Sequence, residues 1–134
     1  MATTTVHRPM TMRLPFTPAS VPEARRRLKT WMLEGGLPDE TMEDARLVLS
    51  ELVANSVRHA RPLADGSILV GWLREDHDLV ITVTDGGGAT IPRQLDATSS
   101  ELAGRGMTIV EALATRWWTD RSPTRQTVHV LLNR

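Results

Sequence analysis

The sequence has 134 residues, the usual length of a single domain. Hydrophobic residues make up 40% and charged residues 24%, a balance that is typical of a soluble globular protein. The 16 basic and 16 acidic residues cancel, so the chain has no positive excess with which to hold a nucleic-acid backbone. It has no cysteine for disulfides or thiolate metal sites, no apolar run of roughly 18 residues for a membrane span, and no secretion signal in residues 1–13. We therefore expect a cytoplasmic protein with no membrane or nucleic-acid partner.

The first half of the chain predicts a strand followed by two helices. Residues 1–9 are expected to form a flexible leader and residues 10–134 a single domain, which begins with a strand at Met10–Phe16. Two helices are predicted to follow the N-caps Ser20 and Asp39. They run to about Glu34 and Ala60, because glycines or a proline come next.

The second half predicts a hairpin, a loop, a helix and another hairpin. Alternating apolar residues predict strands at Ser67–Arg74 and Leu79–Thr84. The small and polar residues of Ala89–Ala103 predict a loop, and a helix is expected from Gly104 to about Thr115. Two strands are predicted to close the chain, at Arg116–Asp120 and Gln126–Leu132. This order predicts an α+β two-layer sandwich, in which a mixed, mostly antiparallel sheet carries the helices on one face.

The second predicted helix carries a polar stripe in an otherwise apolar sequence. Glu51, Asn55 and His59 recur every four residues and therefore share one face. Either this stripe meets solvent, or it forms the edge of an active site. In the second case the Glu51 carboxylate would act as a general base, and the Asn55 side-chain oxygen would be a ligand of Mg²⁺. His59 fits a packing or capping role near the helix end better than a phosphate contact.

Two glycine-containing motifs are candidates for ligand contacts. Asp85 ends a predicted strand and precedes three glycines, a pattern that suits either a tight turn or a base-binding edge whose carboxylate accepts a hydrogen bond from an adenine amino group. Gly104, Arg105 and Gly106 precede a predicted helix, and either form a plain helix start or an anion site that uses the helix N-terminus. Thr127 is either an ordinary strand residue or a hydrogen-bonding group near the base.

These segments resemble, in this order, the N, G1 and G2 boxes of the superfamily shared by gyrase, heat-shock chaperone ATPases, sensor histidine kinases and mismatch-repair ATPases. The matching sequences are Glu51-Leu-Val-Ala-Asn55, Asp85-Gly-Gly-Gly-Ala89 and Gly104-Arg-Gly106. From about Met10 to Leu132 the chain is similar to the stand-alone anti-sigma-factor serine kinases of bacterial partner-switching systems, especially their actinobacterial members. The phrases Ser50-Glu-Leu-Val-Ala-Asn-Ser-Val-Arg-His-Ala60 and Gly104-Arg-Gly-Met-Thr-Ile-Val110 are typical of that branch.

The resemblance implies a histidine-kinase-like ATPase fold and a role for each matching residue. Glu51 would be the catalytic base and Asn55 the magnesium ligand, with Asp85 on the adenine amino group and Gly87 shaping the base pocket. Ala89 stands where a glycine is common, and residues 89–103 would form a lid without lysine, which leaves Arg105 or Arg93 to balance charge in the transition state. The remaining implied nucleotide contacts are His59, Ala89, Gly104, Arg105, Gly106, Met107 and Thr127.

Two functions follow from this resemblance. The first is a protein serine/threonine kinase that uses Mg-ATP to phosphorylate an anti-sigma-factor antagonist and that sequesters a sigma factor. The second is a non-catalytic module whose nucleotide state sets its affinity for a regulatory partner. Retention of Glu51 favours the kinase, because binding alone needs no base. The resemblance also implies a homodimer, whereas a sensor histidine kinase or a gyrase-like machine is disfavoured, since each would need further domains.

Overall fold

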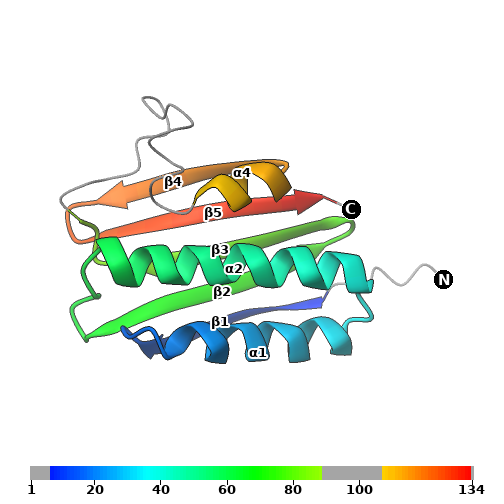
Figure 1. Ribbon diagram of the computed structural model, residues 1–134, viewed down its shortest axis with the longest axis horizontal. Coiled ribbons are helices and arrows are strands. Elements are labelled where there is room, and N and C mark those ends of the chain that lie inside the picture. The colour runs from blue at the N-terminus through cyan, green and yellow to red at the C-terminus, as the bar shows by residue number, and fades with distance from the viewer. Residues whose placement is uncertain (1–6, 89–106, 134) are drawn as a thin grey trace.

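The computed structural model describes residues 7–88 and 107–133. These residues form five strands and three helices, whose arrangement is drawn in Figure 1. In chain order they are β1 (His7–Pro15), α1 (Ser20–Glu34), α2 (Asp39–His59), β2 (Ser67–Glu75), β3 (Asp78–Asp85), α4 (Met107–Leu113), β4 (Arg116–Ser122) and β5 (Arg125–Asn133). None of the described helices is long and apolar enough to cross a membrane.

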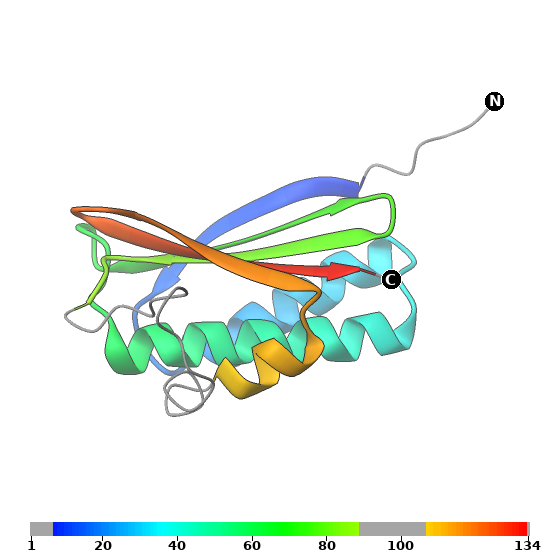
Figure 2. The same cartoon turned by 90° about the horizontal axis from the view of Figure 1, so that it is seen from above.

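The strands form one sheet in the order β1-β2-β3-β5-β4. Figure 2 shows all three helices on the same side of this sheet, which confirms the predicted α+β two-layer sandwich. All four strand pairings are antiparallel, so the expected parallel component of a mixed sheet does not occur among the described strands. The turns between β2 and β3 and between β4 and β5 are short, and short turns join antiparallel strands.

Several predicted boundaries differ from the structure. β1 begins at His7, so the domain starts within the predicted leader, whose first six residues lie outside the described residues. Ser20 and Asp39 are the first helical residues and not the N-caps, which are Ala19 and Pro38 without side-chain cap bonds. The Ser20 hydroxyl instead donates to the Pro15 carbonyl at 2.5 Å, which ties the start of α1 to the end of β1.

The hydrophobic core lies between the sheet and the helices. Side chains of a strand alternate between its two faces, and every second residue of β2, β3 and β5 is buried against α1 and α2. The strand residues of this core are Ile68, Val70, Trp72, Leu79, Ile81, Val83, Val128, Val130 and Leu132. Helix α2 contributes buried side chains along its whole length, since it crosses the middle of the sheet (Figure 1). This placement fixes which polar residues of α2 can reach the strand ends.

Candidate nucleotide-binding site

The polar stripe of α2 lies at the edge of the core and differs in burial from residue to residue. Glu51 and Asn55 are half-buried, whereas His59 is exposed at the last residue of the helix. The His59 side chain makes no hydrogen bond with any described residue, so the structure assigns it no positioning role. The side-chain oxygen Oδ1 of Asn55 is buried and has no hydrogen-bond partner among the described residues. A buried amide oxygen without a hydrogen bond destabilises the protein unless a ligand binds to it. Amide oxygens are also among the ligands that Mg²⁺ prefers.

Asp85, at the end of β3, is the most deeply buried acidic group of the described residues. It is 3% exposed and lies on the helix-bearing face, in alternation with Ile81 and Val83. The Ser56 hydroxyl donates to its Oδ2 at 2.5 Å, and the Gly87 backbone N–H donates to its Oδ1 at 2.8 Å. Burial raises the pKa of Asp85, and these two hydrogen bonds oppose that rise.

The two hydrogen bonds orient the carboxylate without using up its acceptor capacity. An ionised carboxylate has about four lone-pair positions, and two are occupied here by Ser56 and Gly87. The remaining positions can accept a hydrogen bond from an amino group, which is the chemistry expected of an adenine-binding aspartate. Because water is excluded from this side chain, an amino group that fits the pocket gains more from the contact than it would in solvent.

The glycine turn after β3 is held against the segment that follows α2. The Gly86 N–H donates to the Arg61 carbonyl at 2.7 Å, and the Arg61 N–H donates to the Gly87 carbonyl at 2.8 Å. A methyl group at Gly86 would lie 2.1 Å from the Pro62 carbonyl oxygen, so only glycine fits there. Gly87 has a φ of +81°, a left-handed conformation that favours glycine. The turn is therefore a close-packed support for Asp85 and not only a flexible link.

Thr127 lies in β5, next to the end of β3. In the β3–β5 pairing Thr127 lies opposite Thr84, and their hydroxyl groups are 2.8 Å apart. Both threonines alternate with core residues and therefore lie on the face of the sheet away from the helices, whereas Asp85 lies on the helix-bearing face. The residue opposite Asp85 is Gln126, whose side chain is 6% exposed. Gln126 is therefore the β5 residue that shares the helix-bearing face with Asp85.

Only one of the remaining predicted contacts lies among the described residues at the start of α4. Met107, its first residue, is completely buried, so its side chain packs in the hydrophobic core. Four predicted nucleotide contacts and one alternative cation lie outside the described residues. They are Ala89, Gly104, Arg105, Gly106 and Arg93.

Two polar residues of the site were not singled out from the sequence. Ser56 directly follows Asn55 and lies within the family-typical stretch Ser50–Ala60. Its contact with Asp85, 29 residues away in the sequence, is visible only in the fold. Gln126 could have been found from its alternation with Val128 and Val130, which places it on the core side of its strand. Both residues are polar groups in apolar surroundings, the signal that most often marks a specific partner.

An open antiparallel sheet backed by helices, with a buried strand-end aspartate facing the central helix, defines the class of protein. The chain belongs to the histidine kinase-like ATPase domain family, whose sequence model matches residues 14–131.

Individual relatives place the chain within this family. It is 30% identical over 121 residues to the serine-protein kinase RsbW of Listeria monocytogenes, an alignment that covers 81% of this chain and 77% of the relative. The serine-protein kinase RsbW of Listeria innocua is 29% identical over the same length. This similarity confirms the resemblance to the serine kinase branch.

Two solved structures share the fold. A structure of the RsbU and RsbW domains of Rv1364c from Mycobacterium tuberculosis matches with a TM-score of 0.73 and 22% identity over 94% of this chain. This chain spans 32% of that larger one. A structure of the SiaB-SiaC complex from Pseudomonas aeruginosa matches with a TM-score of 0.66 and 9% identity, covering 92% of this chain and 88% of the matched one.

Proposed function

We propose that this chain is an ATP-dependent protein serine/threonine kinase of a bacterial partner-switching system, which phosphorylates an anti-sigma-factor antagonist. Two groups carry this proposal together. They are the buried Asp85 carboxylate, oriented by Ser56, and the buried Oδ1 of the preceding residue Asn55, which has no hydrogen-bond partner among the described residues. The first is suited to an adenine amino group and the second to a magnesium ion. The names of the Listeria relatives, serine-protein kinase, supply the reaction.

Each residue has a proposed role that follows from its position. Asp85 accepts from the adenine amino group, with Ser56 holding the carboxylate and Gln126 beside it. Asn55 is a ligand of Mg²⁺, which neutralises the phosphates when it is bound. Glu51 lies one turn before Asn55 on α2 and is half-buried, so its carboxylate can take the proton from an attacking hydroxyl group.

The partner is proposed from the similar proteins. The matched structures include RsbU and RsbW domains in one chain and a SiaB-SiaC complex, both consistent with a protein that acts on a regulatory partner. Sequestration of a sigma factor and formation of a homodimer belong to the same proposal. A cytoplasmic location follows from it, because ATP and sigma factors are found there.

The reaction is tested by incubating the protein with Mg-ATP and the antagonist encoded beside its gene, and by reading the antagonist's intact mass. A gain of one phosphoryl group on the antagonist supports the kinase. Partner binding that depends on nucleotide, without any mass change, would replace it with the non-catalytic module.

The proposed base is tested with Glu51→Gln, which keeps the side-chain size and removes its basicity. Phosphoryl transfer should fall by roughly 10²–10⁴-fold, the usual contribution of a general base, while ATP binding is retained. Transfer at the wild-type rate would remove Glu51 from the mechanism but leave the kinase activity in place.

A further inference from the structure

A pocket lies beside the glycine turn. It has a volume of about 400 Å³ and is formed where the segment after α2, the glycine turn and the β4–β5 turn meet. Three of its lining residues are arginines, namely Arg61, Arg121 and Arg125. Its walls also include Gly86–Gly88 and Ser122. The pocket thus shares the glycine turn and Gln126 with the site of Asp85, but its three arginines give it different chemistry.

Within residues 7–88 and 107–133, no aspartate or glutamate lines this pocket, and none of its three arginines forms an ion pair. Four other arginines, Arg13, Arg26, Arg27 and Arg46, each form an ion pair, as Arg13 does with Asp65 at 2.9 Å. The whole chain has a net charge of zero, so three guanidinium groups around one pocket, without an ion pair among the described residues, are a local excess.

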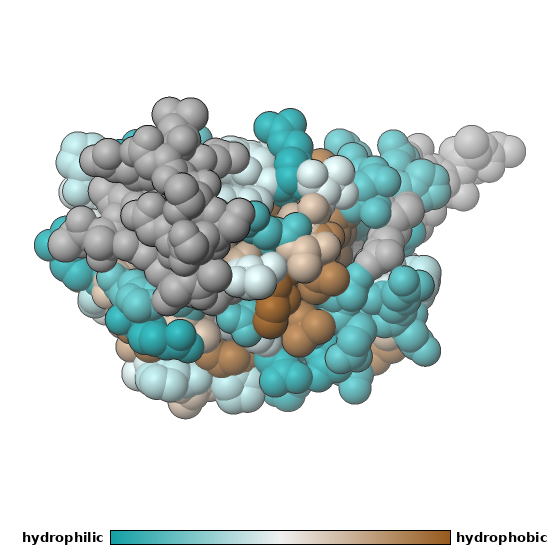
Figure 3. All heavy atoms as spheres, turned by 45° about the horizontal axis from the view of Figure 1, so that its top comes forward, coloured by the Kyte–Doolittle hydropathy of each residue, from teal (hydrophilic) through white to brown (hydrophobic). Residues whose placement is uncertain are grey.

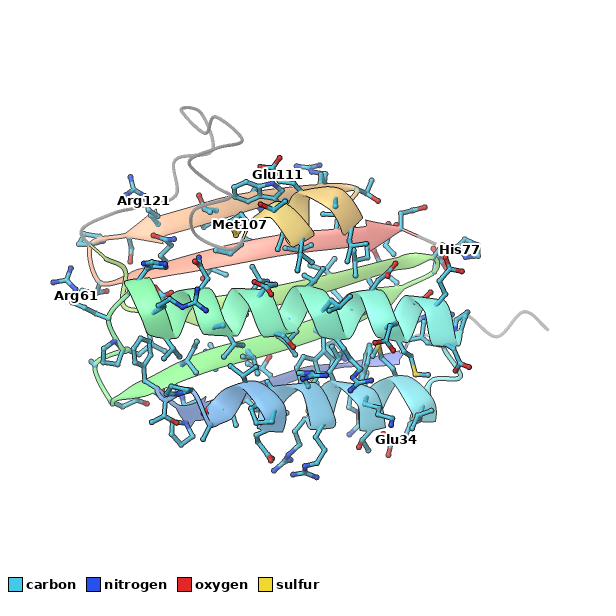
Figure 4. All side chains as sticks on the ribbon, viewed as in Figure 1. Glu34, Arg61, His77, Met107, Glu111 and Arg121 are labelled. Carbon is cyan, nitrogen blue, oxygen red and sulfur yellow. The ribbon has the colours of Figure 1, made fainter. Side chains whose placement is uncertain are left out.

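The arrangement of the arginines favours an extended ligand with several carboxylates. All three are exposed, and they come from two separate segments of the chain. Figure 4 shows Arg61 and Arg121 at the same end of the molecule, pointing outward and not toward a common centre. A compact phosphate ion is best held by groups that converge on it, whereas side chains of successive acidic residues can meet guanidinium groups one at a time.

We propose that this arginine pocket docks an acidic segment of the partner protein. The proposal rests on the proposed function, because partner switching requires a protein that is held and released. Arginine is enriched at protein interfaces, and its planar fork pairs with carboxylates through two hydrogen bonds. Figure 3 shows hydrophilic side chains around a central apolar patch on the visible surface.

The position of the pocket connects partner docking to the nucleotide. Arg61 lines the pocket, and its backbone N–H and carbonyl form two hydrogen bonds with the glycine turn. Gly87 of the same turn donates to Asp85. A segment that binds Arg61 therefore acts on the support of the adenine-binding carboxylate. By thermodynamic linkage, nucleotide binding changes the affinity for the segment by the same factor as the segment changes nucleotide affinity.

The test titrates the full chain with a short capped peptide of alternating aspartate and glutamate, with and without ADP. The matched asparagine and glutamine peptide and inorganic pyrophosphate serve as the other probes. We expect the acidic peptide to bind and Arg121→Gln/Arg125→Gln to weaken it by about tenfold, since two charge-assisted pairs are lost. The control Arg8→Gln/Lys29→Gln removes the same charge from exposed positions outside the pocket and should leave the affinity unchanged.

Three results would overturn the proposal. They are equal losses in both double variants, binding of pyrophosphate but not of the peptide, and an acidic-peptide affinity that ADP does not change. ADP binding and phosphoryl transfer are measured on the same preparations. A chain that binds the acidic peptide but transfers no phosphate refutes the kinase alone, and the reverse result refutes the docking pocket alone.

Discussion

Replacing Ser56 by alanine should weaken nucleotide binding, although Ser56 is not expected to touch the nucleotide. The variant removes the hydroxyl group that donates to Asp85 Oδ2 at 2.5 Å. A hydrogen bond to a charged group contributes about 1.5–3 kcal/mol, and at 3% exposure Asp85 gains little replacement from water. The free energy of unfolding should fall by about 1–3 kcal/mol, and the affinity for ADP by about tenfold because the carboxylate loses its orientation.

The pH dependence adds a second readout for Ser56→Ala. Burial raises the pKa of Asp85, so the folded protein holds this proton more tightly than the unfolded chain. In the absence of nucleotide, the free energy of unfolding should therefore rise as the pH falls through the window between the unfolded and folded pKa values. Affinity for ADP should fall in the same window, because a protonated Asp85 accepts less well. Without the Ser56 hydrogen bond, the loss of affinity should begin at a higher pH.

The assay is calorimetric titration of ADP over a pH series, together with denaturant unfolding of the nucleotide-free protein. Ser50→Ala is the matched control, because the Ser50 hydroxyl on the same helix donates to the Arg46 carbonyl and not to Asp85. Equal effects of the two variants, or an ADP affinity that Ser56→Ala leaves unchanged at every pH, would refute the reasoning.

Three further predictions concern the proposed metal ligand Asn55, the β5 residue Gln126 and the glycine turn. Asn55→Ala should weaken Mg-ATP binding more than metal-free ATP binding, because its proposed role is coordination. Equal losses in titrations with and without Mg²⁺ would make Asn55 structural. Gln126→Leu should lower ADP affinity by about 1–3 kcal/mol while Thr127→Val leaves it unchanged, since only Gln126 shares a face with Asp85. The opposite ranking in calorimetry would restore the original assignment. Gly86→Ala should lower the free energy of unfolding by about 1–3 kcal/mol or more, because its methyl group would lie 2.1 Å from a carbonyl oxygen. A denaturant midpoint equal to that of the wild type would contradict this packing.

Much of the fold could be predicted because its signals are local. Alternation of apolar residues marked β2 and β3, and the apolar surface of residues 39–60 marked a largely buried helix. The prediction failed at the ends of elements. Ser20 and Asp39 are predicted as N-caps because of their residue types, whereas the structure places both inside the first turn of their helices. Helix ends depend on contacts with neighbouring elements, such as the hydrogen bond between Ser20 and Pro15, that propensity does not describe.

The sequence by itself determined the types of groups available and their spacing along each element. Glu51 and Asn55 share a helix face because of the helical period, and Asp85 ends a strand before three glycines. Only the tertiary structure decided which of these groups meet. The register of β3 against β5 places Gln126 and not Thr127 beside Asp85, and the packing of α2 on the sheet brings in Ser56 from 29 residues away. A shift of one residue in strand register moves each side chain to the other face of the sheet. Burial of the whole core sets this register, so it depends on contacts between residues that are distant in sequence.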